Sequence, residues 1–163
     1  MSFRDLLLVI AIGAVFFFAS SSKLPPVVAS HFAAGGAANG FMPKGAYIPF
    51  MAIMALGLPL AIGLLLGLGR YLPASLINLP NRNYWLSPER IDETRQYLGR
   101  QGGVFSALLL VFMCFVHWQV VQANLLQPPR LSERPFVVGL ILFILATAVW
   151  LGVFVAHFRR VRI

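Results

Sequence analysis

The sequence predicts an all-α integral membrane protein with four transmembrane helices. Of its 163 residues, 59% are hydrophobic and only 11% are charged, whereas a soluble domain carries about a quarter charged residues. The hydrophobic residues gather in four runs, and segments rich in proline and polar residues separate them. Each run approaches the roughly 20 residues that a helix needs to cross a bilayer. We therefore expect one membrane domain over residues 1–163, with helices at about 6–22, 47–68, 103–123 and 136–156.

The first two runs carry additional local signals. Run 6–22 follows Arg4 and ends in small residues, as a cleavable secretory signal does, but three more apolar runs follow, so we expect a retained signal anchor. In the second run, Pro59 predicts a kink at about residues 55–59. Gly63 and Gly67 have the spacing of a close helix contact.

Segment 23–46 is polar and glycine-rich, and we expect it to be a loop outside the membrane. Pro25 and Pro26 end the first helix, because proline cannot donate a backbone hydrogen bond and restricts the residue before it. Asn39-Gly40 is typical of a tight turn, since both residues tolerate positive φ. The run AAGGAA at 33–38 permits either close backbone contact or mobility.

The second polar segment, 69–102, contains a helix start. Ser87 is a favourable N-cap, Pro88 suits the first helical position, and Glu89 interacts favourably with the helix dipole. This short charged helix either lies on the membrane surface or runs directly into the third span, with Gly102-Gly103 as the joint.

Basic residues give the net charge of +8, and their distribution predicts an orientation. Nine of the 13 Lys and Arg lie in the two terminal segments and in segment 69–102, and four lie in the other two connections. Because cytoplasmic connections are enriched in Lys and Arg, we expect both termini and segment 69–102 in the cytoplasm. The charges flank apolar runs and form no patch, so we expect the lipid bilayer as a partner and no nucleic acid.

Candidate chemistry is sparse. No Asp, Glu, Lys or Arg lies within the predicted spans, which argues against ion-coupled transporters, proton relays and intramembrane proteases. We interpret His117 as an interface or helix-contact residue, with a functional site in the outer leaflet as the alternative. A zinc site of His31, His117 and Glu133 is a further alternative. No nucleophile–base pair, phosphate loop or dinucleotide motif occurs, so we expect no enzyme, no catalytic residue, no metal and no cofactor.

Three segments carry a resemblance to a known family. Residues 24–44, LPPVVASHFAAGGAANGFMPK, follow the pattern LP-x-x-V-x-x-HF-x-x-x-G-x-x-NG, and NLPNRNYWLSPERIDE at 78–93 and ANLLQPPRL at 123–131 add to it. The chain resembles, over nearly its whole length, a compact four-helix branch of the SdpI-like family, bacterial membrane proteins related to the immunity protein against the sporulation-delaying toxin. The residues that match the outer-loop motif are His31, Phe32, Gly36, Asn39, Gly40 and Lys44. Those that match the cytoplasmic motif are Asn81, Tyr84, Trp85, Pro88, Glu89 and Arg90. An interface anchor together with a helix cap would also explain Trp85, Glu89 and Arg90.

The resemblance implies a non-catalytic binding or accessory protein of the bacterial inner membrane. Its outer loop would dock an extracellular peptide or protein, with Phe32 and Phe41 as apolar anchors and His31 and Asn39 as hydrogen-bonding groups. The loop could instead be a plug that closes the helix bundle. Two other functions remain as alternatives, a structural subunit of a larger membrane complex and a small transporter or lipid-handling protein; a homodimer is also compatible with the sequence.

Overall fold

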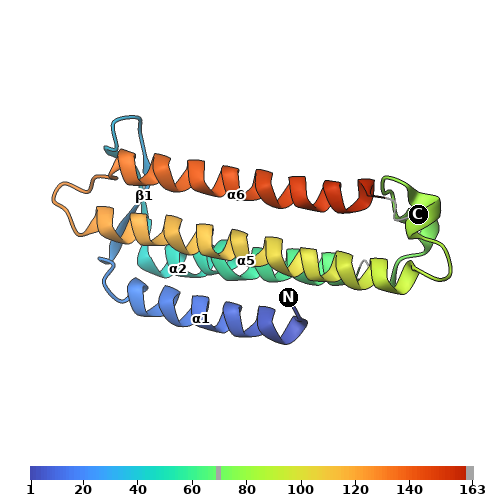
Figure 1. The fold of residues 1–163 in the computed structure, drawn as a ribbon. Helices are drawn as coiled ribbons and strands as arrows, with labels where there is room; N and C mark the ends of the chain where they lie inside the picture. The colour runs from blue at the N-terminus through green and yellow to red at the C-terminus, as the bar shows by residue number, and fades with distance from the viewer. Residues whose placement is uncertain (69–70, 161–163) are drawn as a thin grey trace.

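A computed structural model describes residues 1–68 and 71–160, and four long helical rods dominate it (Figure 1). The rods are α1 (Phe3–Ser21), a second rod of α2 (Lys44–Ala52), the π-helix η1 (Ile53–Gly57) and α3 (Leu58–Leu68), then α5 (Ile91–Asn124) and α6 (Glu133–Arg159). All four are long and apolar enough to cross a membrane. The prediction of four helices long and apolar enough to cross a membrane is confirmed.

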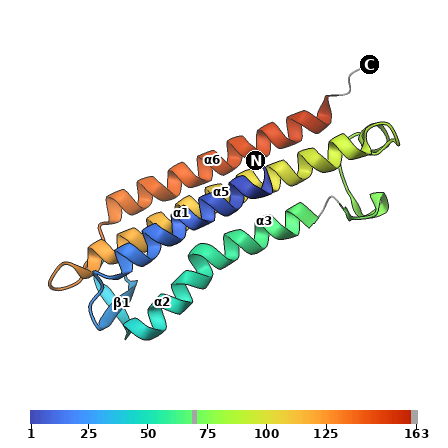
Figure 2. The ribbon, with the colours of Figure 1, turned by 90° about the horizontal axis from the view of Figure 1, so that it is seen from below.

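Helix α5 is the centre of the arrangement. It packs against α1 and α3 on one side and against α6 on the other (Figures 1 and 2). The most apolar stretch of α6 contains no buried residue, since this helix packs mainly on α5. Most of its apolar surface is therefore left for lipid or for a partner.

The expectation of an all-α chain was wrong between the first two rods. Residues expected to form a loop instead form an antiparallel hairpin of β1 (Val27–Phe32) and β2 (Ala38–Pro43), drawn at one end of the bundle in Figure 1. In β2, exposed and partly buried residues alternate, as expected for side chains that point to opposite faces. Phe41 and Pro43 occupy exposed positions of β2, so the strand shows no alternation of apolar and polar residues in the sequence.

The predicted turn at Asn39-Gly40 was also wrong, because both residues lie within β2. The chain reverses instead between Ala33 and Ala37, where the Ala33 N–H donates to the Ala37 carbonyl at 2.8 Å. Gly35 and Gly36 have φ values of 87° and 77°, which glycine adopts without the strain that a Cβ introduces.

The second rod bends where proline predicts it. Pro59 has no N–H to continue the helical hydrogen bonds, and the preceding residues Ile53–Gly57 widen into the π-helix, a common cause of kinks. The Ser106 hydroxyl donates to the Pro59 carbonyl.

A Cβ on Gly63 would lie 2.6 Å from Leu6 and 3.0 Å from the Ser106 hydroxyl oxygen, so this glycine allows α1, α3 and α5 to converge. Gly67 has no atom within 4 Å of its Cβ position, and the predicted close contact holds for Gly63 alone.

The charged segment before the third span runs directly into it, as one 34-residue helix. The predicted N-cap was wrong: Ser87–Arg90 form a turn, and α5 begins at Ile91 with Arg90 in the N-cap position. The Ile91 N–H donates to the Ser87 carbonyl at 3.0 Å. The Ser87 hydroxyl hydrogen-bonds the Glu89 carboxylate and thereby lowers its pKa. Two short helices, η3 (Ala74–Leu76) and α4 (Arg82–Trp85), precede this turn.

A buried apolar cluster lies at the hairpin end of the bundle. It joins α1, the hairpin, α2, η1 and α5, and consists of Phe17, Leu24, Val28, Tyr47, Met51, Ala55, Val120 and Val121. Val28 in β1 is completely buried within it. The hairpin is therefore part of the hydrophobic core.

Candidate functional site

The hairpin carries exposed side chains that take no part in the core, and they define a candidate binding surface. We call them the hairpin surface: Val27, His31, Asn39, Phe41 and Pro43, all exposed. Val27 is opposite Pro43 in the ladder, and Val27 and Phe41 are 59% and 56% exposed. Val27, Phe41 and Pro43 supply exposed apolar side chains, and His31 and Asn39 supply exposed groups for directional hydrogen bonds.

Asn124, at the end of α5, fixes β1 in place. Its amide oxygen accepts from the Ala29 N–H at 2.8 Å, and its amide NH₂ donates to the Ala29 carbonyl at 2.9 Å. The same NH₂ donates to the Val120 carbonyl at 2.9 Å. Ala29 is completely buried, so its peptide groups depend on this side chain as they would on a neighbouring strand.

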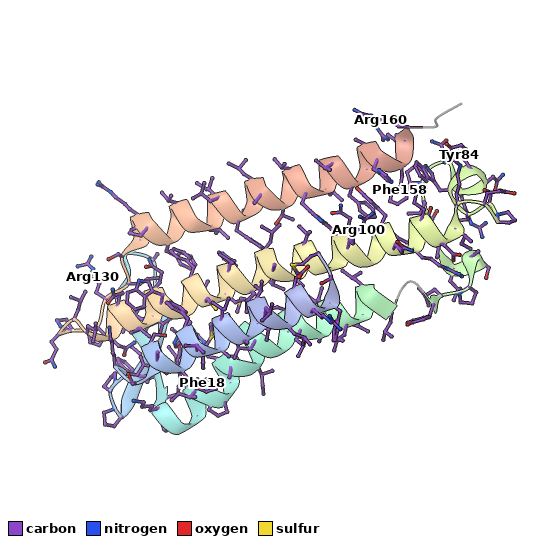
Figure 3. The ribbon with its side chains drawn as sticks, turned by 60° about the horizontal axis from the view of Figure 1, so that its bottom comes forward. Phe18, Tyr84, Arg100, Arg130, Phe158 and Arg160 are labelled. Carbon is purple, nitrogen blue, oxygen red and sulfur yellow. The ribbon has the colours of Figure 1, made fainter. Side chains whose placement is uncertain are left out.

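The hairpin turn is bound to the segment before α6. The Leu131 N–H donates to the Gly36 carbonyl at 2.8 Å, and Arg130 Nε donates to the Gly35 carbonyl at 3.2 Å; Arg130 is labelled at this end in Figure 3. The Gly35 N–H donates to the Glu133 carboxylate. A Cβ on Gly36 would lie 2.1 Å from the Leu131 carbonyl oxygen, so any side chain here would force the turn and Leu131 apart.

The outer-loop motif divides into structural and exposed residues. Lys44 Nζ donates to the carbonyls of Ser22 and Leu24, at 3.2 and 2.8 Å, and so closes the base of the hairpin. Phe32 packs against the core cluster, which leaves Phe41 as the exposed member of the two expected anchors. Gly36 belongs to the structural set, and a Cβ on Gly40 would meet the His31 Cβ at 3.0 Å. His31 and Asn39 are exposed.

His117 lies beneath the hairpin and is completely buried. Its Nε2 is 3.2 Å from the Ser21 hydroxyl, and its Nδ1 is 3.1 Å from the Tyr47 hydroxyl. The Phe17 ring packs on the imidazole with centroids 4.2 Å apart. His117 therefore connects α1, α2 and α5, which agrees with a helix contact and places it inside the bundle rather than at its surface.

The cytoplasmic motif packs on the end of α6, at the opposite end of the bundle (Tyr84 and Phe158 in Figure 3). The Asn81 amide donates to the Phe158 carbonyl at 3.1 Å, and Trp85 Nε1 donates to the same oxygen at 2.9 Å. The Arg90 guanidinium lies over the Tyr84 ring, 4.2 Å from its centroid. Trp85 is 6% exposed, so it is a buried contact rather than a headgroup anchor.

The two remaining residues of this motif do not take part in the contact with α6. Pro88 and Glu89 are both exposed. They lie in the Ser87–Arg90 turn that leads into α5. The motif therefore combines a docking contact with a turn.

Among the described residues, no three His, Cys, Asp or Glu side chains are close enough together to hold a metal ion. The alternative zinc set is not assembled, because His117 is enclosed by Ser21 and Tyr47 while the Glu133 carboxylate binds the hairpin turn. No protein family model, curated protein or solved structure matches the chain.

The sequence interpretation missed Asn124 and the partners of His117. The available signal was polarity at the end of an apolar run, since Asn124 ends the third span just before Pro128-Pro129. Its partner Ala29 lies 95 residues earlier, and nothing local in the sequence connects the two.

We expect Asn124→Leu to lower the free energy of unfolding by about 2–5 kcal/mol, because two buried peptide groups of Ala29 lose their partner. Gln122→Leu is the matched control on the same helix turn, since Gln122 is exposed. The comparison is made on apparent melting temperatures in one detergent. Equal melting temperatures for the two variants would contradict the role of Asn124.

Gly36→Ala and Gly35→Ala separate backbone strain from steric conflict in the hairpin turn. Both residues have positive φ, and an alanine there costs roughly 1–2 kcal/mol from conformation alone. Only at Gly36 does the new methyl group meet a carbonyl oxygen. We expect Gly36→Ala to lower the melting temperature at least twice as much as Gly35→Ala does, and similar losses would show that the contact with Leu131 adjusts freely.

Proposed function

We propose that this chain is a non-catalytic binding or accessory protein of the bacterial inner membrane, related to the SdpI-like family. Its hairpin surface docks an extracellular peptide or protein. The observation that carries this proposal is a fixed hairpin that leaves Phe41, His31 and Asn39 exposed, although its backbone is held by Asn124 and by the 130–133 segment. The inner side of the hairpin closes the bundle, and the outer side is free for a ligand.

A fixed surface favours binding because little conformational entropy is lost when the ligand arrives. Aromatic side chains commonly supply much of the binding energy at an interface, and Phe41 is the aromatic residue of the hairpin surface. The His31 Nδ1 is 3.1 Å from the Ser30 hydroxyl, which leaves Nε2 for a ligand.

A second candidate is a structural subunit of a larger membrane complex. It is favoured by α6, whose most apolar stretch has no buried residue and which packs mainly on α5. In that case α6 is the contact with the partner, and the hairpin surface is not required.

The proposed orientation, with both termini in the cytoplasm, predicts which residues are accessible from outside. In a Cys114→Ser background, Asn39→Cys is expected to react with a membrane-impermeant maleimide in intact spheroplasts, because Asn39 is exposed on the hairpin. Asn83→Cys, exposed in α4 at the other end, is expected to react only after lysis. The reverse pattern would place the hairpin in the cytoplasm and exclude extracellular docking.

Docking through the hairpin surface is tested with the sporulation-delaying toxin as the probe. We expect cells that produce this protein to survive the toxin, and Phe41→Ser or His31→Ala to weaken binding by about 5- to 150-fold, from the loss of roughly 1–3 kcal/mol at an anchor. Phe50→Ser is the control, because Phe50 is 55% exposed on α2 and is not part of the hairpin. Membrane levels of all variants are measured in parallel.

A photoreactive phenylalanine analogue at position 41 or position 50 identifies what the surface touches. Crosslinking of the toxin from position 41 alone supports docking. Unchanged protection in the Phe41 and His31 variants, together with a stoichiometric membrane protein that co-purifies in mild detergent, would instead support the structural subunit.

A further inference from the structure

A cleft opens at the end of the bundle opposite the hairpin. It has a volume of about 470 Å³ and lies between the first turns of α1, the last turns of α3 and the first part of α5. Its apolar walls include Leu6 and Leu64, and glycines Gly67, Gly99 and Gly103 form part of its lining.

Two of these glycines have no packing role within the chain. A Cβ on Gly67 or Gly99 would find no atom within 4 Å, although each glycine lies in a helix. Glycine inside a helix costs about 1 kcal/mol relative to alanine. Because these two glycines have no side chains, the cleft stays open. Neither glycine is needed for a close contact between helices.

Two arginines border the glycine sector of α5. A helix has 3.6 residues per turn, so angles around its axis can be measured from Arg95. The angle is about 40° for Gly99, 80° for Gly103 and 140° for Arg100. The arginines are also separated by about 7.5 Å along the axis, and both line the cleft. Arg100 is labelled on α5 in Figure 3. The lining residues include no Asp or Glu.

Arg95 has unused hydrogen-bonding capacity at this position. Its Nη2 donates to the Leu72 carbonyl at 3.1 Å, and its Nη1 is 3.9 Å from the Asp92 carboxylate. Its Nε is buried and has no hydrogen-bond acceptor, a situation that costs free energy until an acceptor arrives. An anionic oxygen in the cleft would provide one.

We propose that this cleft binds an anionic phospholipid. The phosphate binds Arg95 and Arg100, since guanidinium groups form strong charge-assisted hydrogen bonds with phosphate. An acyl chain lies over the glycines, between α1 and α3. The cleft is at the end of the spanning helices where headgroups are expected, and basic pockets between transmembrane helices are known to hold anionic lipids. This site is independent of the hairpin surface.

The test is native mass spectrometry of the purified full chain with phosphatidylglycerol or phosphatidylcholine. The wild type is expected to retain phosphatidylglycerol at least tenfold better than phosphatidylcholine. Arg95→Gln/Arg100→Gln is expected to remove this preference, whereas Arg134→Gln, an exposed arginine at the other end of the bundle, retains it. Gly99→Leu is expected to abolish the lipid adduct by filling the cleft.

Gly152→Leu is the matched control for Gly99→Leu, because Gly152 is also a helical glycine with no atom within 4 Å of its Cβ position. Melting temperatures establish that each variant is folded. The proposal is overturned if the Gly99→Leu protein is folded and retains the lipid, or if the double arginine variant keeps the preference. Displacement of the adduct by millimolar inorganic phosphate would also overturn it, because the arginines would then bind a free anion.

Discussion

The hydrogen bonds between the Asn124 side chain and the backbone of Ala29 hold the hairpin to the bundle. A two-stranded hairpin is at best marginally stable by itself, and burying an unpaired peptide group in an apolar cluster costs free energy. The asparagine amide carries the same donor and acceptor as a peptide group, and therefore replaces a third strand. His117 lies seven residues earlier on α5, which places it on the same helix face. One face of α5 thus binds β1, α1 and α2.

The fourth helix is held differently. In a bilayer, lipid solvates apolar side chains as well as another helix does, so specific packing and hydrogen bonds hold helices together. Helix α6 is bound through the hairpin turn at its beginning and through the Phe158 carbonyl at its end. Between these points it stacks aromatic rings on α5, with Phe112 and Phe143 at a centroid distance of 4.3 Å. Its other faces carry apolar side chains outward, as a surface that lipid or a partner covers.

The sequence predicts those features of the fold that local chemistry determines. Apolar runs and prolines locate the four helices, and Pro59 locates the bend. The hairpin could not be predicted in this way, because β2 exposes Phe41 and Pro43 instead of polar residues and because its stability depends on Asn124, 95 residues from Ala29. The predicted turn at Asn39-Gly40 was wrong because Gly35 and Gly36 both adopt positive φ in the reversal, and Gly36 packs closely against Leu131. The sequence also does not divide the residues of segment 24–44 by role, because that division depends on contacts with distant segments: Lys44 and Phe32 stabilise the fold, whereas His31 and Asn39 are exposed.

This division constrains the kind of ligand that suits the hairpin surface. Val27 and Phe41 expose apolar side chains near the ends of α1 and α2, where spanning helices meet the headgroup layer. Under the proposed function, Phe41 lies at the depth of that layer and contacts lipid when no ligand is bound. Docking as we propose it would exchange lipid contact for ligand contact, and apolar area alone would give little net binding energy there. In this proposal the polar groups of His31 and Asn39 determine which ligand binds, and an amphipathic peptide that approaches along the membrane surface satisfies both requirements.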